Sequence, residues 1–97
     1  MRQKIERLII DALLEIGEEK KIKKLKNAGK KTFIYGNKGS LDSISLVLFL
    51  SIIEEKISDE LNTNIILASE KAMSRINSPF RSVESLTDYI LELMNEN

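Results

Sequence analysis

Apolar side chains near the start of the chain recur at the spacing of an amphipathic helix. They follow the i, i+3, i+4, i+7 rule, and they are Ile5, Leu8, Ile9, Ala12, Leu13 and Ile16. This pattern predicts a helix over about residues 2–16 with one face toward a core. Gly17 then stands where a helix C-cap is expected.

A long basic stretch follows over residues 18–38. Ile22 and Leu25 are the only large apolar residues between 18 and 31, so this part predicts either a short helical turn or a mobile loop. Residues 32–35 are apolar and β-prone, and the glycines and polar residues of 36–40 break this piece. We therefore expect a basic loop over 18–38 between the first and second helices.

The second predicted helix begins at Asp42 or Ser43 and runs to about Leu61. Ser43 is an N-cap residue type, and Leu41 before it suits a hydrophobic staple. From Ile44 to Ile53 the helix is apolar nearly all round. That is wider than one core-facing stripe, so something other than the core must cover part of it.

Two more helices are expected in the last third of the chain. Ser69 can cap a short third helix over 70–76, which Pro79 and its neighbours stop. Ser82 can cap a fourth helix over 83–95, whose inward residues are Val83, Leu86, Ile90 and Leu93. The predicted fold class is all-α: a four-helix up-down bundle with a short third helix, in one domain spanning 1–97.

Composition narrows the chemistry. The chain has no Cys and no His, so it offers no disulfide, no thiolate or imidazole metal ligand and no Ser-His-Asp triad. We expect no metal site, no catalytic residues and no enzymatic activity. No apolar run approaches the roughly 18 residues of a membrane span, and charges interrupt the N-terminal apolar pattern as they would not in a secretory signal. We expect a cytoplasmic protein.

Charge is unevenly distributed although the net charge is zero. Residues 1–38 hold 11 Lys+Arg and 5 Asp+Glu, a net charge of +6, whereas residues 39–97 hold 4 and 10, a net charge of −6. Seven lysines lie between 20 and 31. They could contact nucleic acid, an anionic membrane or an acidic partner, or form a solvated loop. The lack of interleaved aromatic residues favours the solvated loop and no nucleic-acid partner.

One short segment carries candidate chemistry. Ser43 stands at a helix start after a Gly-containing loop, so its hydroxyl is expected to be exposed, with Asp42 beside it. Asp42-Ser43-Ile44, followed by an apolar helix and then Glu54-Glu55, resembles the phosphopantetheine attachment site of acyl carrier proteins. Segments 70–73, 78–81 and 85–90 resemble the third and fourth helices of stand-alone carrier proteins. The resemblance covers about residues 2–16 and 39–95.

This resemblance implies a covalent cofactor and a set of partners. A phosphopantetheinyl transferase would attach 4′-phosphopantetheine from coenzyme A to Ser43, with Asp42 and Ile44 flanking the attachment site. The thiol of the arm would carry an acyl or aminoacyl group as a thioester, which also suits a chain without Cys. An acyl- or amino-acid-activating ligase and an acyltransferase would be the other partners of this monomer. The simpler interpretation is that Asp42 and Ser43 only cap a helix.

The chain departs from fatty-acid-type carriers in two places. Leu48 stands where those carriers have an acidic residue, and Leu46 is bulky where a small polar residue is common. We therefore expect a dedicated biosynthetic pathway, with docking through Leu46 and Leu48 and help in encounter from Glu54 and Glu55. The alternative is an unmodified helical adaptor that binds partners through Leu46, Leu48 and Ile52.

Overall fold

The computed structural model describes residues 1–36, 38–67, 69 and 79–96. This part of the chain contains three α-helices and one 3-10 helix: α1 (Arg2–Glu19), η1 (Lys23–Asn27), α2 (Ser43–Leu61) and α4 (Val83–Glu96). The all-α class is confirmed for these residues. The expected short helix over 70–76 lies outside the described residues, so the described part holds three α-helices and not four.

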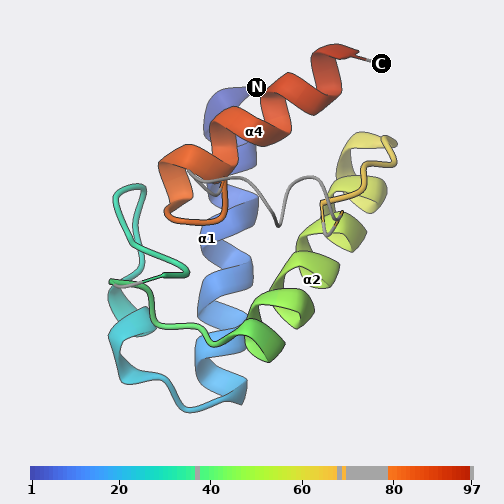
Figure 1. Cartoon of the computed structure of the whole chain (residues 1–97). Helices are drawn as coiled ribbons and strands as arrows, with labels where there is room; N and C mark the ends of the chain where they lie inside the picture. The colour runs from blue at the N-terminus through green and yellow to red at the C-terminus, as the bar shows by residue number, and fades with distance from the viewer. Residues whose placement is uncertain (37, 68, 70–78, 97) are drawn as a thin grey trace.

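Helix α1 is the centre of the arrangement, because α2, α4 and η1 each pack against it (Figure 1). Figure 1 also shows that α2 runs opposite to α1, whereas α4 crosses α1 obliquely. The predicted apolar stripe of α1 is buried along its length, from Ile5 to Ile16. None of the described helices is both long and apolar enough to cross a membrane.

Gly17 does not cap α1, which continues to Glu19. The chain turns instead at Lys21, whose φ of 59° lies in the left-handed region, and the Ile22 N–H donates to the Gly17 carbonyl at 2.7 Å. Leu25 then packs directly on Gly17, since a Cβ added at Gly17 would lie 2.7 Å from the Leu25 Cβ. Gly17 is therefore a close-packing residue rather than a helix stop.

The basic stretch has a structured centre. Residues 23–27 form η1, so the helical-turn alternative is confirmed, and Leu25 is buried in the core. The lysines of η1 remain exposed around this single anchor. The loop predicted over 18–38 is therefore shorter in the structure. Its first two residues belong to α1, and Leu25 of η1 packs against the end of α1.

The β-prone residues 32–35 pair with two distant segments instead of forming a sheet. Phe33 makes an isolated antiparallel bridge with Ser82, and Tyr35 makes an isolated parallel bridge with Leu41. Ile34, between Phe33 and Tyr35 in the chain, is buried. Its N–H donates to the Arg81 carbonyl at 2.7 Å, and its carbonyl accepts from the Leu41 N–H at 3.0 Å. This piece therefore joins the residues just before α2 to those just before α4.

Helix α4 begins as predicted. Ser82 and Ser85 cap it reciprocally: the Ser85 N–H donates to the Ser82 Oγ at 3.2 Å, and the Ser82 N–H donates to the Ser85 Oγ at 3.0 Å. Its predicted inward residues are buried except Leu93, which is half-buried. An ion pair between Arg2 and Asp88, 2.6 Å apart, links α4 to the start of α1.

Candidate functional site

The candidate site is the first turn of α2. Asp42 is its N-cap: the residue is extended, its Oδ1 accepts from the Ser45 N–H at 2.8 Å, and its carbonyl accepts from the Leu46 N–H at 2.9 Å. Of the two starts that the sequence left open, the structure has Asp42 as the cap and Ser43 as the first helical residue. Ser43 is therefore free of any capping role.

Hydrogen bonds from Ser45 stabilise the charged form of the Asp42 side chain at the start of α2. The Ser45 backbone N–H is the main cause that lowers the pKa of Asp42; the Ser45 hydroxyl and then Lys20, at the end of α1, lower it further. Figure 1 shows that the end of α1 and the start of α2 lie at the same end of the molecule.

A tight turn delivers the chain to this helix start. Gly36 has a φ of 101°, and the Gly39 N–H donates to the Gly36 carbonyl at 3.1 Å. A Cβ at Gly39 would collide with the backbone of Tyr35. The turn thus needs both glycines, and it sets Leu41 beside Tyr35, two residues before Ser43.

Ser43 is exposed, and an apolar strip lies next to it on the outer face of α2. The strip consists of Ile44, Val47 and Leu48, residues that are 77%, 47% and 39% exposed. Together with Ser43 and Ser51 they line a shallow, open hollow. We call this set of Ile44, Val47 and Leu48 the α2 strip. Its apolar surface is what the wide apolar pattern of the second helix predicted.

Leu46 does not belong to this surface, and its predicted docking role is wrong. Its side chain is fully buried, as are the residues of the same helical stripe, Phe49, Leu50, Ile53 and Ile57. Leu46 stands at the N4 position opposite the buried Leu41 at N′, the two positions of a hydrophobic staple. Val47 takes its place outside. Sequence reasoning missed Val47, although its spacing of three residues from Ile44 put it on the same face.

The two predicted acidic docking residues have different surroundings. Glu54 is half-buried, and its Oε2 accepts from the Leu67 N–H at 2.8 Å, so it ties the segment after α2 back to the helix. Glu55 is exposed and follows Ser51 by four residues, at the far end of the face that carries the α2 strip. Glu55 is therefore the carboxylate that shares a face with the α2 strip.

The residues that the sequence singled out are brought together only in part. Asp42, Ser43, Ile44 and Leu48 share one end of α2, Leu46 lies beneath them in the core, and the half-buried Ile52 packs against the core. No family model, no curated protein and no solved structure matches this chain.

Proposed function

We propose that the protein is a carrier that holds an acyl or aminoacyl group as a thioester on a 4′-phosphopantetheine arm attached to Ser43. The observation that carries the proposal is the position of Ser43: an exposed hydroxyl at the first residue of a long helix, after a tight turn. Because Asp42 does the capping, this hydroxyl is not needed for the stability of α2.

The surroundings of Ser43 suit the phosphodiester that this modification creates. The Ser43 oxygen would attack the phosphorus that bears the pantetheine arm of coenzyme A, losing its proton to a base of the transferase. Adenosine 3′,5′-bisphosphate would leave. The new phosphate would lie at the positive end of α2, and Lys20 would partly offset the charge of the neighbouring Asp42. The bound arm would supply the thiol that forms the thioester.

The α2 strip supports a docking role beside the attachment point. Exposed apolar residues next to a reactive group usually mark a contact surface, and burying them drives association. An acyl- or amino-acid-activating ligase and an acyltransferase are the partners we propose for this surface, with Glu55 assisting encounter. A mainly apolar docking face favours a dedicated biosynthetic pathway with its own loading enzyme, in the cytoplasm.

Intact-mass spectrometry tests the modification directly. Incubation with coenzyme A and a broad-specificity phosphopantetheinyl transferase should add one phosphopantetheine to the wild-type chain and none to Ser43→Ala. Ser51→Ala is the matched control, because Ser51 is another exposed serine on the same face, and it should still be modified. Both variants should keep the wild-type stability within about 0.5 kcal/mol. Modification of Ser43→Ala would refute the assignment.

An unmodified adaptor is the second candidate, and the exposed α2 strip favours it independently of Ser43. Such a protein would bind a partner through Ile44, Val47 and Leu48 without any cofactor. The same mass experiment separates the two functions: an unmodified wild-type chain, with folding verified by circular dichroism, leaves the adaptor as the function that the surface supports.

A further inference from the structure

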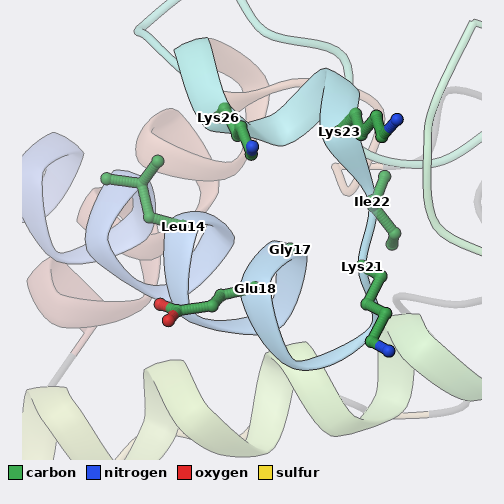
Figure 2. A pocket seen from close by; sticks show the side chains of 7 residues that line it. All are labelled: Leu14, Gly17, Glu18, Lys21, Ile22, Lys23 and Lys26. Carbon is green, nitrogen blue, oxygen red and sulfur yellow. The ribbon is translucent and has the colours of Figure 1, made fainter.

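A cleft of about 570 Å³ lies where the end of α1 turns into η1, and the carrier function does not use it. Leu14, Gly17 and Ile22 give it an apolar floor, with Leu14 39% exposed and Ile22 half-buried. Its rim carries three exposed lysines, Lys21, Lys23 and Lys26. Figure 2 shows these side chains arranged around Gly17, together with Glu18 of α1. We call it the α1–η1 cleft.

Packing holds the cleft open. The left-handed turn at Lys21 and the hydrogen bond from the Ile22 N–H to the Gly17 carbonyl fold η1 back along the helix end. The buried Leu25 then packs against Gly17. With this anchor inside, Lys23 and Lys26 stay outside. The lysines are thus presented by a packed turn around an apolar floor.

The charges around the cleft indicate what it would bind. Residues 20–31 hold seven lysines and no carboxylate, so the rim attracts negative charge. The apolar floor gains nothing from a phosphate, and Glu18 at the edge repels one. The seven lining residues include no aromatic side chain for stacking on bases. A ligand with both an apolar side chain and carboxylates satisfies floor and rim together.

We propose that the α1–η1 cleft binds an acidic amphipathic segment of a partner protein. An apolar side chain of that segment would enter between Leu14 and Ile22, and its carboxylates would pair with Lys21, Lys23 and Lys26. The cleft shares no lining residue with the hollow beside Ser43. The proposal therefore stands whether or not Ser43 carries a cofactor, and the unmodified chain is the protein to test.

Fluorescence anisotropy with a short labelled peptide tests the proposal. The probe is a helical peptide with a leucine stripe flanked by glutamates; one control peptide has glutamine for each glutamate, and another has serine for each leucine. We expect the probe to bind at least tenfold more tightly than either control. Raising the salt until the Debye length falls from about 10 Å to about 3 Å should weaken probe binding by about tenfold or more.

Charge-reversed variants locate the binding. Lys23→Glu with Lys26→Glu should weaken probe binding about tenfold or more, whereas Lys30→Glu with Lys31→Glu makes the same charge change outside the cleft and should weaken it less than threefold. Leu14→Gln should also weaken binding. All four lysines are exposed, so circular dichroism should report wild-type folding for both double variants.

Three results would overturn the proposal. The first is equal weakening by the two lysine pairs, which would mean non-specific attraction to net charge. The second is binding of anionic phospholipid vesicles or duplex DNA that equals or exceeds binding of the probe, which would assign the lysines to phosphate. The third is no preference for the probe over its serine control, which would remove the apolar floor from recognition.

Discussion

Replacing Gly17 with alanine tests the tightest contact between α1 and the basic segment. Gly17 lies inside α1, where a glycine-to-alanine change ordinarily gains about 1 kcal/mol of helix propensity. Here the new Cβ would lie 2.7 Å from the Leu25 Cβ, well inside the optimal carbon–carbon separation of about 3.5–4.0 Å. The clash involves a Cβ and not a flexible side-chain end, so the backbone of η1 must move.

The gain in helix propensity and the loss of Leu25 burial together set the sign and size of the change in stability. Displacing the buried Leu25 costs about 2 kcal/mol of apolar burial, which exceeds the gain in propensity by about 1 kcal/mol. For a domain of this size that difference lowers the melting temperature by about 4–8 °C. Thermal unfolding followed by circular dichroism measures it. Hydrogen exchange should show faster exchange of the Ile22 N–H, which donates to Gly17, while the middle of α2 stays protected.

Gly29→Ala is the matched control for this experiment. No atom lies within 4 Å of a Cβ at Gly29, and its φ is not in the left-handed region. The change should therefore raise stability by about 0.4–1 kcal/mol through the unfolded chain. If Gly17→Ala also raised the melting temperature, the close approach of Leu25 to Gly17 would be wrong, and with it the shape of the α1–η1 cleft.

The remaining predictions concern α2. Leu46→Ala should destabilise the protein by about 2–5 kcal/mol in urea unfolding, because Leu46 is fully buried; a surface-like loss below about 0.5 kcal/mol would contradict its burial. For the proposed carrier, Leu48→Glu should leave stability nearly unchanged but slow loading by the proposed ligase tenfold or more, about 1.4 kcal/mol, and equal loading rates would remove Leu48 from the proposed docking surface. Asp42→Ala should lower stability near neutral pH. Because the folded pKa of Asp42 is lowered, its contribution is present above the ordinary value of 3.8 and is lost as pH falls through the folded pKa, so the wild type and Asp42→Ala should converge in acid; a pH-independent difference would refute this.

Capping and turn residues in the sequence predicted the helix ends that are set by neighbouring residues in the chain. Ser82 caps α4 as predicted, and α2 begins at Ser43, one of its two predicted starts. The predicted end of α2 at Leu61 is confirmed, and Asn62 after it has a φ of 51°. Gly17 has the same local signature as a C-cap. It was misread because the contact that explains it, with Leu25, depends on how the chain folds back after Lys21.

The rotation of α2 could not be predicted from its own sequence. Apolar residues surround the helix from Ile44 to Ile53, so periodicity does not say which side faces inward. Packing against α1 decides it and buries Leu46 while leaving Val47 outside. The exposure of Ser43 was predicted from its position at the start of the second helix, and the structure confirms it. Its chemistry remains a proposal.

The pairing of Ile34 sets an order of events during synthesis of the chain. The Ile34 carbonyl accepts from the Leu41 N–H, two residues before Ser43, whereas the Ile34 N–H donates to the Arg81 carbonyl. The Val83 N–H also donates to the Thr32 carbonyl, at 3.0 Å. A chain grows from its N-terminus at about 5–20 residues per second, so α2 is synthesised about 1–4 seconds before these partners exist. The approach to Ser43 is therefore completed only when α4 has begun to form. An enzyme that recognises this folded approach would act only after residues 81–83 have been synthesised.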